Sequence, residues 1–233
     1  MPQMKHIEII AFDADDTLWH NESLFTITQD KYKKLLAKYH TEEWIESRLF
    51  DTETENIKHF GYGVKGFTLS MIETAIELSE GRITGAEINQ IIDFAKQMLR
   101  SPIELLESVE ETIEKLSQTH ELMIITKGDL FDQESKIARS GLAEYFSKIE
   151  IVKEKDEEIY QKILTKYQID KDKFVMIGNA LKSDILPVLR IGSSAVHIPY
   201  HTTWAREIVA EEELKNYNFL QLKGMKNLAE LFV

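Results

Sequence analysis

A short apolar run leads directly into three carboxylates: Ile7-Glu8-Ile9-Ile10-Ala11-Phe12-Asp13-Ala14-Asp15-Asp16-Thr17-Leu18-Trp19. The run Ile7–Phe12 is typical of a buried strand, and carboxylates this close raise each other's pKa unless a cation lies between them. A solvated acidic turn, or carboxylates that cap a following helix, would explain the cluster without any function. We favour a ligand site, because open sheets bind ligands where central strands end. Divalent hard cations, above all Mg²⁺, suit such oxygen ligands.

Further apolar runs predict four more strands. In most of them the residues that face either side of the sheet are apolar, which is typical of parallel strands covered on both faces. The helical patterns between them include Gln133–Ala138, which leads to a C-capping Gly141, and Glu157–Tyr167. Strands that alternate with helices predict an α/β fold, a doubly wound Rossmann-like parallel sheet. The predicted strands are Ile7–Phe12, Leu122–Thr126, Ile149–Val152, Phe174–Ile177 and Ala195–Ile198.

A purely helical stretch interrupts this alternation between the first and second strands. From about residue 20 to about residue 100 the sequence holds helical periodicity and no strand candidate, most clearly in Ile88, Ile91, Ile92, Ala95, Met98 and Leu99. A further helix is expected over Glu104–Leu116. We therefore predict an α/β core of residues 1–19 and 100–233 and an inserted all-helical cap domain of residues 20–99.

The amino-acid composition excludes several kinds of chemistry and of binding partner. The 233 residues contain no cysteine, which excludes disulfides, thiolate metal sites and a thiol nucleophile. Lys plus Arg number 28 against 40 Asp plus Glu, a net charge of -12 that repels nucleic acid and anionic membranes. No secretory signal and no run of ~18 apolar residues is visible. We expect a cytoplasmic protein that binds neither nucleic acid nor membrane.

The stretch Phe12–Leu18 resembles the first motif of the haloacid dehalogenase (HAD) superfamily, the nucleophile signature DxDx(T)L. Three further stretches follow in the family's order. The second, Met123–Asp129, is similar to the motif in which a Thr side chain and the following backbone N–H groups hold a phosphoryl group. This resemblance implies that Thr126, Lys127 and Gly128 bind the substrate. Lys127 stands where many relatives have Asn.

The third stretch, Val152–Asp156, resembles the motif whose lysine pairs with the nucleophile and the phosphate. Lys155 fits this role best and Lys153 is the alternative, because Glu157 to Tyr160 follow much as in relatives. The fourth stretch, Ile177–Ile185, resembles the acidic motif that completes a Mg²⁺ site. The implied metal ligands are Asp13, Asp15, Asn179 and Asp184. Asn179 replaces the Asp of most relatives, and a neutral ligand lowers the negative charge of the site.

The resemblance implies a Mg²⁺-dependent phosphohydrolase of the phosphatase branch with a helical, C1-type cap. Asp13 would attack phosphorus, Asp15 would act as general acid and base, and Thr126, Lys155 and Mg²⁺ would stabilise the transferring phosphoryl group. A 2-haloacid dehalogenase is an alternative, but such relatives usually lack the second aspartate. A phosphomutase and a non-catalytic phosphate-ligand binder, the latter suggested by Asn179, also stay open. The expected partner is a small phosphorylated molecule, and the expected state is a monomer or homodimer.

Overall fold

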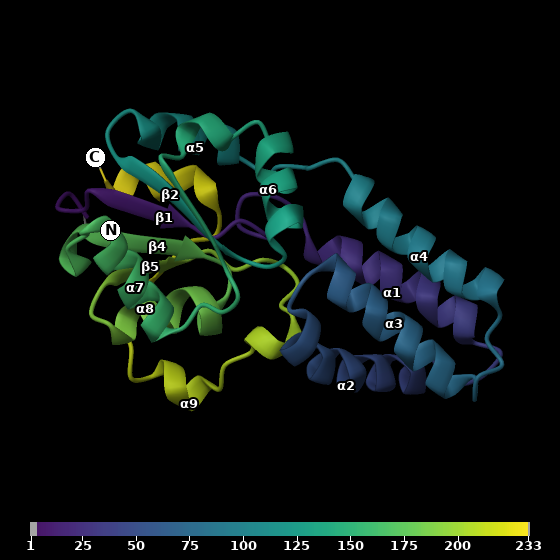
Figure 1. The fold of residues 1–233 in the computed structure, drawn as a ribbon. Helices are drawn as coiled ribbons and strands as arrows, with labels where there is room; N and C mark the ends of the chain where they lie inside the picture. The colour runs from purple at the N-terminus through teal and green to yellow at the C-terminus, as the bar shows by residue number, and fades with distance from the viewer. Residues whose placement is uncertain (1–3, 233) are drawn as a thin grey trace. The chain divides into compact units, whose positions relative to one another are not determined.

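The α/β part of the protein is built on a six-stranded parallel sheet. The computed structural model describes residues 4–232. The strand order is β3-β2-β1-β4-β5-β6 (Figure 1), so the winding direction reverses between β1 and β4. Ligands of open α/β sheets bind at the carboxyl ends of the strands beside such a reversal. The strands are β1 (Ile9–Phe12), β2 (Glu121–Lys127), β3 (Lys148–Val152), β4 (Phe174–Gly178), β5 (Ser194–His197) and β6 (Leu220–Gln221).

Alternate side chains of each strand enter separate hydrophobic cores on the two faces of the sheet. Ile10, Phe12 and Ile124 pack with α5 (Val109–Ser117) on one face. Ala11 and Met123 pack on the other face, with α7 (Glu157–Tyr167) and α8 (Leu186–Arg190). Both faces of β1 and β2 are therefore buried, which explains why these strands are apolar at nearly every position. The predicted α/β fold with a doubly wound parallel sheet is confirmed.

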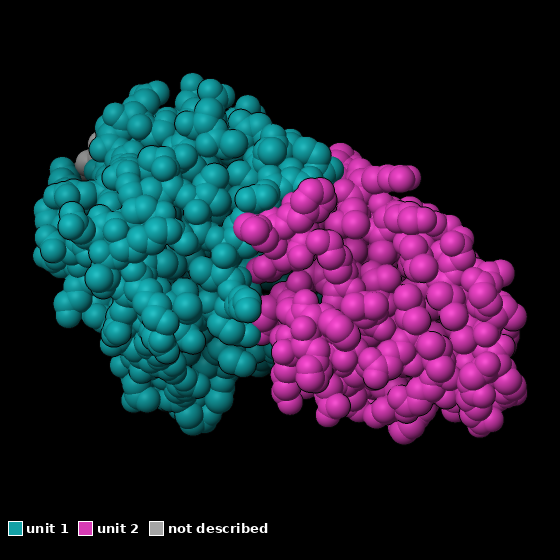
Figure 2. All heavy atoms as spheres, in the orientation of Figure 1, with its two compact units in different colours: residues 1–22, 103–127, 134–233 teal, residues 23–102, 128–133 magenta. Residues whose placement is uncertain are grey.

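The described chain divides into two compact units (Figure 2). One comprises residues 1–22, 103–127 and 134–233, and the other residues 23–102 and 128–133. The second unit packs four helices around its own core of buried residues that include Tyr32, Leu49, Phe67 and Ile91. These helices are α1 (Glu22–Leu36), α2 (Glu42–Phe60), α3 (Val64–Leu78) and α4 (Gly85–Arg100).

Helix α4 shows how local sequence sets an element's limits. Thr84 and Glu87 form a capping box at its start, with each side chain accepting from the other's backbone N–H. Ile91 and Met98 of its apolar stripe are buried. The predicted periodicity of this segment is confirmed, because one apolar face and a capped first turn together specify a helix.

The helix predicted over residues 104–116 is wrong in its first turn, since α5 begins only at Val109. The residues before it pair instead with the segment around Leu18 and Trp19. Leu105 forms an isolated bridge with Trp19, and the Leu106 N–H donates to the Leu18 carbonyl at 3.0 Å. These contacts join residues far apart in the sequence and override the local helical pattern. The short strand β6 was also not predicted.

Candidate active site

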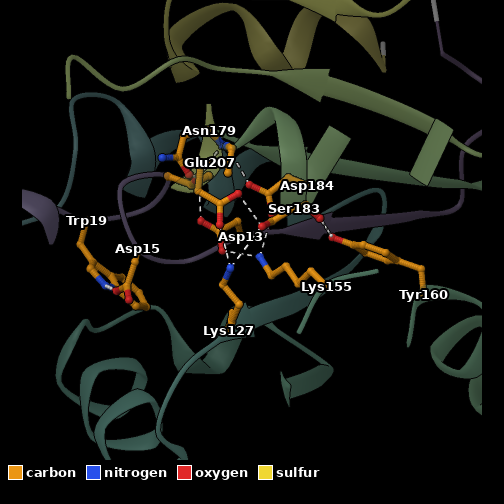
Figure 3. A network of polar contacts seen from close by, with 12 residues as sticks. Asp13, Asp15, Trp19, Lys127, Lys155, Tyr160, Asn179, Ser183, Asp184 and Glu207 are labelled. Carbon is orange, nitrogen blue, oxygen red and sulfur yellow. Dashed lines mark hydrogen bonds and ion pairs between the residues drawn. The ribbon is translucent and has the colours of Figure 1, made fainter. Parts of the chain in front are cut away.

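The polar side chains singled out in the sequence gather where neighbouring strands end (Figure 3). Asp13 follows β1, Lys127 is the last residue of β2, and Asn179 follows β4. The Asp13 N–H donates to the Ile177 carbonyl at 2.9 Å, so the pairing of β1 with β4 continues into the site. The site therefore lies at the reversal of strand order, which is where the topology predicts a ligand.

Asp13 is buried and has a partner for each carboxylate oxygen. Its Oδ1 accepts from Lys155 Nζ at 2.5 Å, and its Oδ2 accepts from Thr17 Oγ1 at 3.1 Å. Burial raises the pKa of Asp13 to about 7, with Lys155 opposing the rise and Asp184 adding to it. A cation beside Asp13 would favour its charged, nucleophilic form.

Lys155 joins two carboxylates in the interior. Its Nζ contacts Asp13 and lies 2.8 Å from Asp184 Oδ1, and the lysine is only 5% exposed. Burial alone would lower the pKa of Lys155, but Asp13 and Asp184 together raise it above its ordinary value. Lys153, the alternative for this role, is exposed. The structure thus places Lys155, and not Lys153, beside Asp13.

A short π-helical turn, η3 (Leu181–Ile185), positions Asp184. Asp184 Oδ2 accepts from the Ala180 N–H at 2.9 Å, and the hydroxyl of buried Tyr160 donates to the Ser183 carbonyl at 3.0 Å. Gly178 makes room for this carboxylate, because a Cβ at that position would lie 2.3 Å from Asp184 Oδ2. The turn therefore depends on a glycine at the end of β4.

Thr17 connects Asp13 to Asn179. Its Oγ1 lies within hydrogen-bond distance of Asp13 Oδ2 and, at 3.2 Å, of Asn179 Oδ1, and it accepts from the Asn179 N–H at 3.1 Å. Within residues 4–232, no three Asp, Glu, His or Cys side chains gather to hold a metal ion. The oxygens of Asp13, Asn179 and Asp184 are nevertheless the donor type that Mg²⁺ prefers. These residues fit a Mg²⁺ ion only if the neutral Asn179 contributes an oxygen.

Asp15 is separate from this buried cluster and has its own partners. Its Oδ1 accepts from Trp19 Nε1 at 2.8 Å, and both of its oxygens lie within 3.0 Å of Lys136 Nζ. Lys136 also donates to Asn21 Oδ1 at 2.9 Å. Any proton transfer by Asp15 would therefore require its ion pair with Lys136 to open. The remaining residue of the acidic stretch, Asp16, accepts from two backbone N–H groups at the start of α1.

The residues predicted to bind a phosphoryl group follow one another at the end of β2. Thr126 is buried, and Gly128 has a φ of 156°, a region that favours glycine. A Cβ at Gly128 would lie 3.0 Å from Gln133 Cγ, so the turn into α6 (Leu130–Arg139) is closely packed. Lys127 forms an ion pair with Glu207 at 2.7 Å.

Sequence reasoning did not assign Lys136, Ser183 or Glu207 to the site. Lys136 lies on α6, one helical turn after Gln133, where its side chain reaches Asp15. Ser183 precedes Asp184 and donates to Glu207 Oε2 at 2.6 Å. For Lys136, a lysine on the buried face of an amphipathic helix is a weak signal of a role in the site. Glu207 ends a short 3-10 helix, η4 (Ala205–Glu207), and no local sequence pattern marks it.

Comparison with known protein families identifies the fold and the kind of chemistry. A family model described as haloacid dehalogenase-like hydrolase matches residues 7–192, which include Asp13, Lys155 and Asp184. The chain belongs to the haloacid dehalogenase-like hydrolases. Comparison with curated protein sequences gave no match. As a HAD-like hydrolase, the protein has a Rossmann-type core with helical insertions, as the sequence predicted.

Solved structures give the same fold. A HAD-like hydrolase from Xanthomonas campestris is 41% identical, with a TM-score of 0.80, over 85% of this chain and 84% of that chain. A HAD hydrolase from Bacillus subtilis bound to magnesium is 15% identical over 97% and 98%, with a TM-score of 0.66. A predicted phosphoglycolate phosphatase from Haemophilus somnus is 16% identical over 99% and 100%, with a TM-score of 0.63. Other matches are 2-haloacid dehalogenases, so the fold is common to both chemistries. No helix among the described residues could cross a membrane.

Proposed function

We propose that this HAD-like hydrolase is a Mg²⁺-dependent phosphohydrolase that cleaves small-molecule phosphate esters through an aspartyl-phosphate on Asp13. The observation that carries the proposal is the buried pairing of Lys155 with both Asp13 and Asp184, together with Asp15 two residues beyond Asp13. Asp15 favours a phosphatase over a dehalogenase, because only the phosphatase has to protonate its leaving group.

In the first step, a carboxylate oxygen of Asp13 attacks phosphorus while the bond from phosphorus to the leaving oxygen breaks. Once its ion pair with Lys136 has opened, Asp15 takes up a proton from solvent and gives it to the leaving oxygen. Lys155 and the hydroxyl of Thr126 stabilise negative charge on the phosphoryl oxygens.

In the second step, Asp15 takes a proton from water, and the water oxygen attacks phosphorus. The bond from phosphorus to Asp13 then breaks, which releases inorganic phosphate and restores both aspartates to their starting forms. Residues 20–99, which we propose act as a cap, would exclude bulk water and select the organic part of the substrate.

The charges of the site support a requirement for a cation. Four carboxylates, Asp13, Asp15, Asp184 and Glu207, face three ammonium groups, Lys127, Lys136 and Lys155. With all of them ionised, one negative charge is in excess; with Asp15 protonated, as the first step requires, the charges cancel. In neither form does the site offer an anionic substrate a net positive charge. Mg²⁺ held by the predicted ligands Asp13, Asp15, Asn179 and Asp184 would supply that charge and polarise the phosphoryl group.

Phosphate release from an aryl phosphate tests this function, measured with Mg²⁺ and with EDTA. We expect release that requires Mg²⁺ and is lost in Asp13→Asn. Chloride release from 2-chloropropionate is measured in parallel. Chloride release without phosphate release would overturn the proposal and indicate the dehalogenase reaction.

A further inference from the structure

Three side chains form a closed polar triangle beside the proposed phosphoryl site (Figure 3). Lys127 Nζ lies 2.7 Å from Glu207 Oε1 and 3.2 Å from Ser183 Oγ, and Ser183 Oγ donates to Glu207 Oε2 at 2.6 Å. The three residues come from the end of β2, from η3 and from a short turn over Ala205–Glu207. Two of them are direct neighbours in sequence of Thr126 and Asp184. The triangle thus joins the phosphoryl-binding strand end to the turn that carries Asp184.

The triangle holds an ion pair that is largely removed from water. The side chains of Lys127 and Glu207 are 14% and 11% exposed. Burial alone would raise the pKa of Glu207, but Lys127 and Ser183 together hold it below its ordinary value. Glu207 is therefore charged at neutral pH, and the pair as a whole carries no net charge. Charges in such a poorly solvated place act on their neighbours more strongly than exposed charges do.

Glu207 comes from outside the part of the chain that matches the family. That match ends at residue 192, whereas Lys127 lies within it. The ion pair therefore joins a lysine within the matched part to a carboxylate from a segment that follows it. These two features make sense together, because each neutralises the charge of the other.

We propose that Glu207 sets the affinity of the active site for phosphate by neutralising Lys127. The proposal rests on the proposed phosphohydrolase function and adds to it a residue that determines affinity. With Glu207 present, Lys127 contributes little net attraction, so the substrate dianion is bound mainly by Lys155, Thr126 and the cation. Weak attraction on this side favours release of the phosphate product. If Glu207 only holds Lys127 in place, Glu207→Gln leaves phosphate binding unchanged or weakens it.

Inorganic phosphate is the probe, and its Kd is measured by calorimetry in Mg²⁺ for the full chain and four variants. Glu207→Gln keeps the shape of the side chain but leaves Lys127 with an unbalanced positive charge, so phosphate should bind about tenfold more tightly. Lys127→Met leaves Glu207 unbalanced and should weaken binding by a similar factor. The double variant is neutral again and should bind as the wild type does. Glu207→Asp keeps the charge and should also bind nearly as the wild type does.

The sign of the change in Glu207→Gln decides between the two roles of Glu207. Unchanged or weaker phosphate binding in Glu207→Gln overturns the proposal, and so does equal weakening in both single variants and the double variant. Thermal unfolding of each variant confirms that it is folded, and the double variant keeps the test valid if one single variant unfolds.

Wild-type turnover separates this inference from the proposed function. If the wild type neither cleaves an aryl phosphate nor binds phosphate, the phosphohydrolase function fails. If the wild type does both and Glu207→Gln gains no affinity, only the role of Glu207 is wrong.

Discussion

Replacing Lys155 with methionine tests the charge arrangement at the centre of the site. The substitution keeps a long side chain but removes the ammonium that contacts both Asp13 and Asp184. The two carboxylates, 7% and 1% exposed, then face each other without compensation in the interior. Breaking a buried ion pair by removal of one partner costs about 3–5 kcal/mol. We expect the free energy of unfolding of Lys155→Met to fall by this amount.

Urea unfolding in EDTA at neutral pH measures this loss. Lys153→Met is the matched control, because Lys153 is exposed and its replacement should change stability by less than about 0.5 kcal/mol. Asp13→Asn added to Lys155→Met removes one of the two unpaired charges and should restore more than about 1 kcal/mol. The reasoning is refuted if Lys155→Met is as stable as Lys153→Met, or if Asp13→Asn gives no recovery.

Three further variants test other parts of the account. Gly178→Ala places a methyl group 2.3 Å from Asp184 Oδ2. The resulting displacement of this carboxylate should lower kcat/KM for an aryl phosphate by about a hundredfold. Unchanged kinetics would contradict the role of this glycine. Asn179→Asp adds a carboxylate and should lower the Mg²⁺ concentration that gives half-maximal activity by about tenfold; an unchanged Mg²⁺ titration would argue against Asn179 as a ligand. Burial raises the pKa of Asp16 to about 6, against 3.8 when exposed. The charged form of Asp16 therefore destabilises the fold above pH 6 by about 3 kcal/mol, and this cost disappears as the pH falls towards 4. Asp16→Asn should therefore gain stability relative to the wild type at pH 8 but not at pH 4, and a difference in urea unfolding that does not vary with pH would contradict this.

The central strands were predictable because burial on both faces leaves a strong local pattern. Residues 174–177 are all fully buried, and the predicted strand differs from β4 by one residue. Strand β6 has only two residues and lies at the sheet edge, so it leaves no such pattern. The segment before α5 was wrongly predicted to be helical because its conformation is set by pairing with Leu18 and Trp19, and local periodicity holds no sign of that pairing.

The same distinction applies to the site. Asp13 and Asn179 directly follow strands, and Thr126 is the residue before the last of β2, so their approach to one edge of the sheet follows from the parallel order alone. The positions of Lys136 and Glu207 depend on where α6 and the segment after β5 run in space. Glu207 reaches Lys127 across 80 residues of sequence. Long-range pairs of this kind could not be derived from one sequence, because each side chain alone is an ordinary charged residue.

Trapping the phosphorylated enzyme tests the central claim most directly. The protein is mixed with an aryl phosphate and Mg²⁺, quenched in acid during turnover and digested, and the peptide that contains Asp13 is examined by mass spectrometry. We predict that this peptide carries one alkali-labile phosphoryl group and that Asp13→Asn carries none. Phosphate release without any modification of the Asp13 peptide, or with the phosphoryl group on another residue, would contradict the assignment of Asp13 as the nucleophile.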